Sequence, residues 1–230
     1  MVKTFVILHG WESDLKKWQP LKQLFQKQGF EVFLPKLPSQ KPINTLDYVK
    51  WFNQQTKNLK KFYLIGHSFG GQIAINFTAE FPQKVAKLIL INSAGIRKKT
   101  SLKRLIFWPI AKSGRLLFSL PFFNRWEKPA KKLFYQAARE SDYFKATPAM
   151  KQTLKIITRE DQKDNLKKIK TQTLILWGAK DKITPLAHAK IMDKILSQST
   201  LAVFPDTTHG LPFQQPETVC QKILWFISSN

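Results

Sequence analysis

The stretch Gly66-His67-Ser68-Phe69-Gly70 decides the fold of this chain. The apolar, aromatic run before it (61–65, Lys-Phe-Tyr-Leu-Ile) is typical of a buried strand, and the run after it (71–77, Gly-Gln-Ile-Ala-Ile-Asn-Phe) favours a helix. A Gly-x-Ser-x-Gly sequence between a strand and a helix predicts a sharp turn that projects the serine hydroxyl into a cleft. The flanking small residues let neighbouring backbones pass without steric clash.

The same turn supplies groups that bind negative charge. At the first turn of a helix, free backbone N–H groups and the positive end of the helix dipole lie beside the serine, where they can hold an oxyanion. The alternative interpretation is a glycine-rich turn without chemistry, because a bare Gly-x-Ser-x-Gly string occurs often by chance. The strand before the turn and the helix after it favour the chemical interpretation.

Length and composition predict one domain with a sizeable buried core. The chain has 230 residues, of which 43% are hydrophobic, and no apolar stretch approaches the length that spans a bilayer. The run Thr4–Leu8 is too short for the core of a signal peptide and leads into His9-Gly10, so we interpret it as the first strand. The single cysteine, Cys220, excludes an intramolecular disulfide, and a cytoplasmic location is expected.

The formal net charge of +23 raises the question of an anionic partner, either a nucleic acid or a membrane surface. The lysines are spread along the whole chain, including predicted helix faces, and no recognised nucleic-acid motif accompanies them. A source proteome rich in lysine would give the same charge. We therefore expect no specific nucleic-acid partner, and contact with a membrane surface stays an alternative.

Short apolar runs alternate with amphipathic stretches, as expected of a parallel sheet with helices on both faces. Two of the helices have clear start signals, Asn44-Thr45 and Thr184-Pro185. The pattern predicts an α/β fold with a mostly parallel, six-stranded sheet. The predicted strands are Thr4–Leu8, Glu31–Leu34, Phe62–Ile65, Leu88–Ile91, Thr173–Trp177 and Leu201–Phe204, and the predicted helices include Trp18–Gln28, Leu46–Asn58, Gly71–Phe81, Leu186–Leu196 and Glu217–Ile227.

The alternation stops between about residues 97 and 166, where no strand is predicted. Lysines and arginines there interleave with aromatic residues such as Trp108 and Phe122, and prolines divide the segment into short helices. We interpret residues 97–166 as a helical cap inserted into a core of residues 1–96 and 167–230. The alternative is a plain helical excursion whose aromatic side chains pack on the core. Its basic, aromatic character also permits contact with an anionic membrane surface.

An activated serine needs a general base, and the base needs an acid that fixes its tautomer. His209 is the predicted base, because it follows the last predicted strand in a loop that can reach over the edge of the sheet. His67 adjoins the serine but points away from it by the geometry of the turn. Asp181 is the predicted acid, since it follows the preceding strand, and the competing Asp206 more plausibly forms a hydrogen bond within its own loop. The histidines lack carboxylate or thiolate partners at ligand spacing, so neither a metal nor another cofactor is expected.

With these residues in place, the chain resembles the α/β-hydrolase superfamily over nearly its whole length. Four motifs carry the resemblance: His9-Gly10-Trp11, the serine turn 66–71, Gly178-Ala179-Lys180-Asp181, and His209-Gly210. The segment Asn92-Ser93-Ala94-Gly95 is typical of the small, cap-bearing esterases and carbon–carbon bond hydrolases. The leading antiparallel hairpin of the family is absent, and the loop 35–40 lacks the glycines usual there.

The resemblance implies a serine hydrolase with Ser68, Asp181 and His209 as catalytic triad and the backbone N–H groups of Trp11 and Phe69 as oxyanion hole. The expected substrate is a small-molecule carboxylic ester with a small to medium, apolar or aromatic acyl group, lactones included. Two alternatives are a carbon–carbon bond hydrolase of ring-cleavage products and a non-catalytic protein that binds polyanions or membrane surfaces. The residues expected to bind substrate are His9, Gly10, His67, Trp108 and Phe122.

Overall fold

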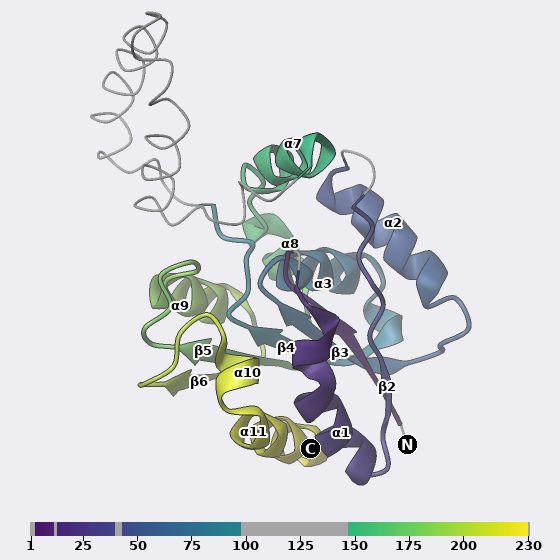
Figure 1. Cartoon of the computed structure of the whole chain (residues 1–230), viewed down its shortest axis with the longest axis vertical. Helices are drawn as coiled ribbons and strands as arrows, with labels where there is room; N and C mark the ends of the chain where they lie inside the picture. Colours follow the sequence, from purple (N-terminus) through teal and green to yellow (C-terminus); the bar gives the residue numbers. More distant parts are fainter. Residues whose placement is uncertain (1–2, 12, 40–42, 98–146, 230) are drawn as a thin grey trace, which may run out of the picture.

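A computed structural model of the chain describes residues 3–11, 13–39, 43–97 and 147–229 (Figure 1). These residues contain a six-stranded sheet in the order β2-β1-β3-β4-β5-β6, and each neighbouring pair is parallel. The predicted α/β fold is confirmed, with a sheet that is parallel throughout these strands. The strands are β1 (Thr4–Leu8), β2 (Glu31–Phe33), β3 (Phe62–His67), β4 (Val85–Ile91), β5 (Thr173–Gly178) and β6 (Ser199–Phe204).

Helices cover both faces of the sheet (Figure 1). One face packs against α2 (Thr45–Gln55), α3 (Phe69–Glu80), α8 (Lys163–Lys168) and α9 (Leu186–Ile195). The opposite face packs against the short 3₁₀ helix η1 and three helices, namely η1 (Leu15–Trp18), α1 (Gln19–Lys27), α10 (Leu211–Gln214) and α11 (Pro216–Ser228). The remaining elements are the 3₁₀ helix η2 (Pro82–Lys84) and α7 (Pro148–Ile157).

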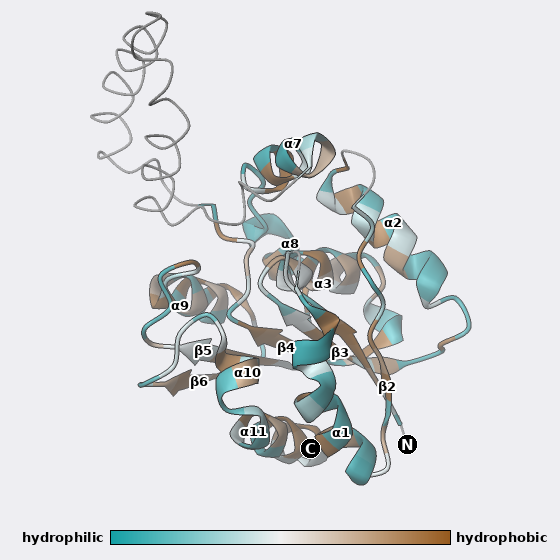
Figure 2. Cartoon of the chain, viewed as in Figure 1, coloured by the Kyte–Doolittle hydropathy of each residue, from teal (hydrophilic) through white to brown (hydrophobic). Residues whose placement is uncertain are grey.

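The apolar runs of the sequence are continuous because both faces of the strands are buried. In β1, Val6 and Leu8 belong to one core cluster, whereas Phe5 and Ile7 belong to the other. Side chains alternate between the faces of a strand, so a strand between two helix layers needs apolar residues at consecutive positions. Figure 2 shows the strands mostly in the brown of hydrophobic residues, while α1 carries much of the teal of hydrophilic ones.

Helix starts depart from the predictions in two places. The predicted helix Trp18–Gln28 is divided, because Trp18 closes a 3₁₀ turn and α1 begins at Gln19 with a proline in its first turn. Asn44 caps α2 through the predicted start signal, in a reciprocal pair of hydrogen bonds with Asp47. The threonine of the other signal makes no capping hydrogen bond, and Pro185 stands at the cap position of α9.

The predicted cap falls mainly on residues 98–146, which lie outside the described residues together with Trp108 and Phe122. Within 147–168 the structure contains α7 and α8, and Leu166 of α8 is buried in the core. The division into core and cap stays a prediction. Among the described helices, none combines the length and the apolar character that a bilayer crossing requires.

Candidate active site

Ser68 stands between β3 and α3 in a backbone conformation that non-glycine residues rarely adopt, with φ of 53° and ψ of −121°. Such a conformation costs roughly 1–3 kcal/mol and persists only where its surroundings enforce it. Two glycines allow the turn to be this tight. A Cβ atom at Gly66 would lie 2.6 Å from the Cα of Gly71, and one at Gly70 would lie 2.0 Å from the carbonyl oxygen of Leu8.

The end of β4 holds the serine backbone in this conformation. The N–H of Ser68 donates to the carbonyl of Ile91 at 3.2 Å, and the carbonyl of Ser68 accepts from the N–H of Ala94 at 2.8 Å. Both bonds place the serine at the carboxyl-terminal edge of the sheet, where ligands bind in open parallel sheets.

The predicted acid and base meet at this edge. Asp181 follows β5 and His209 follows β6, and the distance from His209 Nδ1 to Asp181 Oδ2 is 2.8 Å. The Asp181 side chain is fully buried, whereas 18% of the His209 side chain is exposed. An imidazole whose Nδ1–H donates to a carboxylate carries its free lone pair on Nε2, which is the arrangement of a general base.

Two residues that the sequence analysis did not assign to the site surround Asp181. Thr184 Oγ1 donates to Asp181 Oδ2 at 2.7 Å, and the Thr184 N–H donates to Oδ1 at 2.9 Å. From the end of β4, the side-chain amide of Asn92 donates to Oδ2 at 2.5 Å. The spacing of Asp181 and Thr184, three residues apart after a strand, is the sequence signal for a loop in which a carboxylate caps nearby N–H groups.

These contacts keep Asp181 ionised. Burial by itself raises the pKa of a carboxyl group, but the hydrogen bonds from His209, Thr184 and Asn92, together with the charge of His209, lower the pKa of Asp181 to about 2. The acid therefore carries its negative charge at neutral pH, as an orienting partner for the base requires.

His67 lies beneath the base and is buried. Its Nε2 donates to the backbone carbonyl of His209 at 3.0 Å, and the two rings are 5.0 Å apart. Burial and the neighbouring His209 lower the pKa of His67 to about 3, so this ring stays neutral. Its Nδ1 is buried without a hydrogen-bond partner. Instead of facing a substrate, the ring faces Gly10, where a Cβ would lie 3.1 Å from Nδ1.

His9 is also engaged by the protein itself. Its Nδ1 donates to the carbonyl of Gly10 at 2.7 Å, and its Nε2 accepts from the N–H of Leu37 at 3.1 Å. Burial lowers the pKa of His9, and the charge of Lys36 adds to this effect. Both ring nitrogens are occupied by backbone groups, so the ring has no free polar atom to offer a substrate.

The predicted oxyanion donors lie on both sides of the serine. A Cβ atom at Gly10 would lie 3.1 Å from Ser68 Cβ, which brings the Gly10–Trp11 peptide beside the hydroxyl, and Phe69 is the first residue of α3. The N–H groups of Trp11 and Phe69 take no part in the turn and loop hydrogen bonds of the described chain. The rings of these two residues pack edge to face, with centroids 5.7 Å apart.

The remaining predictions have mixed outcomes. Asp206 forms an exposed ion pair with Lys180, at 2.8 Å, in place of the hydrogen bond predicted within its own loop. Where both partners are described, the Ser68 hydroxyl forms no hydrogen bond with the His209 ring. Catalytic contacts of this kind are often long before substrate binds. The described residues contain no group of three or more histidine, cysteine, aspartate or glutamate side chains that could hold a metal ion.

Comparisons with known proteins agree with this architecture. The chain is 27% identical to a pimeloyl-[acyl-carrier protein] methyl ester esterase of Wigglesworthia glossinidia brevipalpis, over 96% of this chain and 92% of that protein. It is 23% identical to a 2-hydroxy-6-oxo-6-phenylhexa-2,4-dienoate hydrolase of Burkholderia cepacia, over 96% of this chain and 84% of that one.

A solved structure shares the fold. The esterase EaEST from Exiguobacterium antarcticum superposes with a TM-score of 0.70 at 20% identity, covering 99% of this chain and 91% of that one. A sequence model described as the alpha/beta hydrolase fold matches residues 3–216. The chain belongs to the alpha/beta hydrolase family.

Proposed function

We propose that this protein is a serine hydrolase that cleaves carboxylic esters through an acyl-enzyme, with Ser68 as nucleophile, His209 as general base and Asp181 as the acid that orients the base. The observation that carries the proposal is the 2.8 Å contact between His209 Nδ1 and buried, ionised Asp181, at the edge where Ser68 occupies its strained turn. A carboxylate, an imidazole and a hydroxyl that follow three strands of one parallel sheet can act on one carbonyl group.

In the first step, His209 Nε2 removes the proton from the Ser68 hydroxyl as the serine oxygen attacks the ester carbonyl. The carbonyl oxygen becomes an oxyanion, which the N–H groups of Trp11 and Phe69 stabilise. One preorganised donor of this kind is worth about 3–4 kcal/mol in the transition state. The tetrahedral intermediate collapses, the bond to the alcohol breaks, and His209 gives its proton to the departing oxygen.

In the second step, water replaces the alcohol. His209 removes a proton from the water as it attacks the acyl-serine carbonyl, and the same two N–H groups hold the second oxyanion. Collapse returns the proton to Ser68 and releases the carboxylic acid. Asp181 stays ionised throughout and compensates the positive charge that forms on His209 in each half-reaction.

Two histidines position this machinery. His9 holds the carbonyl of Gly10, and in a trans peptide the N–H of Trp11 points the opposite way, so this hydrogen bond directs the donor toward the serine. His67 fixes the backbone of His209. We therefore replace the expected substrate contacts of His9 and His67 with positioning roles.

The substrate is proposed to carry a small to medium, apolar or aromatic acyl group, lactones included. The methyl ester esterase among the relatives supports ester cleavage. The relative named as a dienoate hydrolase supports the second candidate, a carbon–carbon bond hydrolase that would use the same three residues. A binding protein has no need of an ionised, buried acid bonded to an imidazole, so a purely non-catalytic role has less support.

Ser68→Ala tests the assignment. The substitution removes the nucleophile and leaves the turn in place, so turnover of p-nitrophenyl acetate and butyrate should disappear while the thermal unfolding midpoint changes little. The wild type should react covalently with a fluorophosphonate at Ser68. Unchanged turnover in Ser68→Ala would reject the nucleophile.

A substrate panel separates the two enzymatic candidates. Esters and lactones of graded acyl length are compared with a dienol–ketone of the ring-cleavage class by kcat/KM. Ester cleavage predicts the higher kcat/KM for a member of the ester series. A higher value for the dienol–ketone, lost in Ser68→Ala, would assign the carbon–carbon bond hydrolase instead.

A further inference from the structure

The two edges of the sheet differ in their chemistry. Because each neighbouring pair of strands is parallel, the amino ends of the strands lie at one edge, while Ser68, Asp181 and His209 follow carboxyl ends at the other. Both chain termini lie at the lower side of Figure 1, far from α7 at the top. The amino-terminal edge is therefore remote from the candidate active site.

Lysines stand before the amino end of each strand. Each of the six described strands is preceded, within five residues, by at least one lysine, and all but Lys84 of this set are exposed. Lys57, Lys60 and Lys168 add further exposed ammonium groups beside the same strand starts. We call this set the basic edge. The lysines nearest each strand are Lys3, Lys27, Lys61, Lys84, Lys170 and Lys194.

Few acids oppose these lysines. Glu31, Glu80 and Asp193 are the acidic residues at the starts of the strands or at the ends of the helices that lead into them. The exposed ion pairs between described residues involve Lys163, Lys167 and Lys180, which are not members of the basic edge. The edge therefore presents a concentration of positive charge that attracts an anionic surface.

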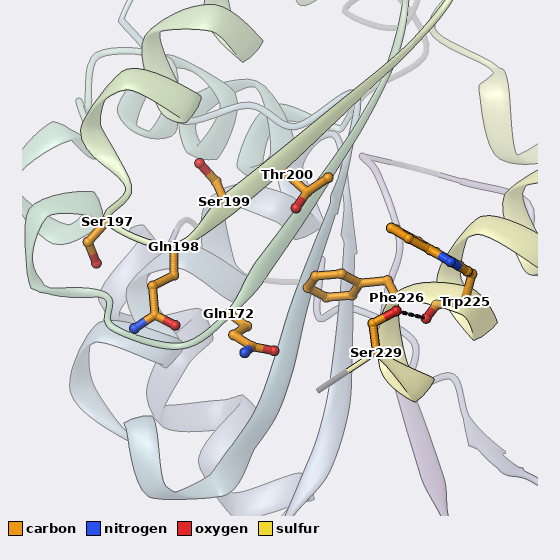
Figure 3. Close-up of a pocket in the computed structure, with 8 residues that line it drawn as sticks. All are labelled: Gln172, Ser197, Gln198, Ser199, Thr200, Trp225, Phe226 and Ser229. Atoms are coloured by element: carbon orange, nitrogen blue, oxygen red, sulfur yellow. Dashed lines mark hydrogen bonds between the residues drawn. The ribbon is translucent and has the colours of Figure 1, made fainter.

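An exposed tryptophan lies at the same edge. Trp225, in the last turn of α11, is 60% exposed, and it borders a hollow of about 290 Å³ between that turn and the starts of β5 and β6 (Figure 3). Amide and hydroxyl side chains line the opposite wall, from Gln172 and residues 197–200. Lys87 reaches the inner side, where its Nζ donates to the carbonyl of Phe226 at 2.8 Å.

We propose that the basic edge, with Trp225 beside it, is a docking face for the anionic phospholipid surface of a membrane. Indole rings with one apolar and one polar side concentrate at the level of lipid headgroups, and lysines near an anionic leaflet bind its phosphates electrostatically. Hydroxyl and amide groups of the hollow suit the polar part of a headgroup. Docked this way, the catalytic edge faces the aqueous phase, so a substrate reaches it from solution.

The residue types favour a membrane over a nucleic acid. The basic edge consists of lysines, while the described arginines, Arg97 and Arg159, lie between the carboxyl end of β4 and α8. Arginine supplies the planar, bidentate contacts and stacking that nucleic-acid recognition uses, whereas lysine acts as a point charge. A single exposed indole among lysines therefore fits a lipid surface better than a base-stacking groove.

Vesicle sedimentation tests the proposal with the full chain. The protein is mixed with phosphatidylcholine vesicles, and with vesicles of phosphatidylcholine and phosphatidylglycerol in equal amounts, at physiological salt. Binding is expected for the anionic vesicles. The triple variant K170Q/K194Q/K222Q removes lysines within three residues of the hollow. Each lysine near an anionic surface contributes about fivefold in affinity, so the variant should bind roughly 100-fold more weakly.

The matched control removes equal charge from the other edge. K16Q/K17Q/K155Q takes away three exposed lysines of η1 and α7 and should weaken binding less than threefold. Trp225→Ser should weaken binding about fivefold, and the vesicle-induced blue shift of tryptophan emission should disappear in this variant. Melting followed by circular dichroism verifies that each variant is folded.

Three results would overturn the proposal. Equal weakening by the control and test variants would mean that only overall charge matters. Equal binding to vesicles without phosphatidylglycerol would remove the role of lipid charge. Tighter binding of single-stranded RNA than of anionic vesicles, dependent on Trp225, would assign the face to a nucleic acid.

Discussion

The imidazole of His67 donates a hydrogen bond from Nε2 to the backbone carbonyl of His209 at 3.0 Å. His67 immediately precedes the serine, so one hydrogen bond joins the turn that carries the nucleophile to the loop that carries the base. The two elements otherwise come from opposite parts of the chain. The relative position of Ser68 and His209 therefore depends on a side chain that takes no part in proton transfer.

Replacing His67 tests this dependence. His67→Leu fills the space with an apolar side chain but removes the donor, and we expect kcat for a p-nitrophenyl ester to fall roughly 10- to 100-fold, the cost of a small displacement of a catalytic group. His67→Gln keeps an N–H donor and should retain more of kcat, with KM similar in both variants. Equal loss in the two variants would mean that the donor is not what positions His209.

His67 also predicts how stability depends on pH. In the unfolded chain its pKa is near 6.5, whereas in the folded protein it is about 3, so the unfolded state binds more protons below pH 6.5. The stability that this neutral ring contributes is present above pH 6.5 and is lost on acidification toward pH 3. Between pH 7 and pH 5 the loss from this group is about 2 kcal/mol.

Urea unfolding at pH 7 and pH 5 measures this loss. His67→Gln cannot take up the proton, so the change in unfolding free energy between the two pH values should shrink by about 2 kcal/mol, whatever the absolute stability of the variant. His9, whose pKa is also lowered, acts in the same direction and remains in both proteins. An identical pH dependence in wild type and variant would contradict the prediction.

Asp181→Asn tests the acid. Asparagine keeps the size of the side chain but presents an uncharged amide to His209, which disfavours the tautomer that acts as base. We expect kcat to fall roughly 10⁴-fold. Asp206→Asn is the matched control, because Asp206 pairs with exposed Lys180, and its kcat should change less than twofold. Loss of activity in the control, with Asp181→Asn active, would exchange the roles of the two carboxylates.

Much of the fold could be predicted from the sequence because its signals are local. Continuous apolar runs indicated strands covered on both faces, and the glycines of the serine turn indicated a tight strand-to-helix junction. The boundaries were less certain. β4 begins at Val85, three residues before its predicted start, because Lys87 reaches from the strand to the end of α11 and so interrupts the apolar run.

The site was harder to predict, since its contacts depend on tertiary structure. Asp181 and His209 were selected as polar residues in loops after strands, a pattern visible in the sequence. Asn92 was not assigned a role because its amide reaches Asp181 from the end of another strand, with a φ of 44° that the sequence does not reveal. His9 and His67 stood where a substrate contact was plausible, and only packing determined that their nitrogens face backbone groups.

Thr184→Val tests the support of the acid. The Thr184 hydroxyl lies 2.7 Å from Asp181 Oδ2, 3.2 Å from His209 Nδ1 and 3.0 Å from the carbonyl of Asn92. Valine has the same shape without the hydroxyl, so the carboxylate loses a donor, at a cost of about 1.5–3 kcal/mol for a hydrogen bond to a charged group. We expect kcat to fall about tenfold or more, with little change in Thr184→Ser. Equal activity of the valine and serine variants would contradict this role.

Gly10→Ala tests the crowding around the nucleophile. A Cβ at this position would lie 3.1 Å from Ser68 Cβ and 3.1 Å from His67 Nδ1, closer than ordinary van der Waals contact. The serine or the Gly10–Trp11 peptide must then move, which would displace the proposed oxyanion donor, and loss of one such donor costs about 10²–10³ in kcat. Gly210→Ala is the control, because a Cβ there meets its nearest neighbour at 3.8 Å. Steady-state kinetics on one ester should give near-normal kcat for Gly210→Ala and a loss of at least tenfold for Gly10→Ala, and equal kcat in both would place the oxyanion site elsewhere.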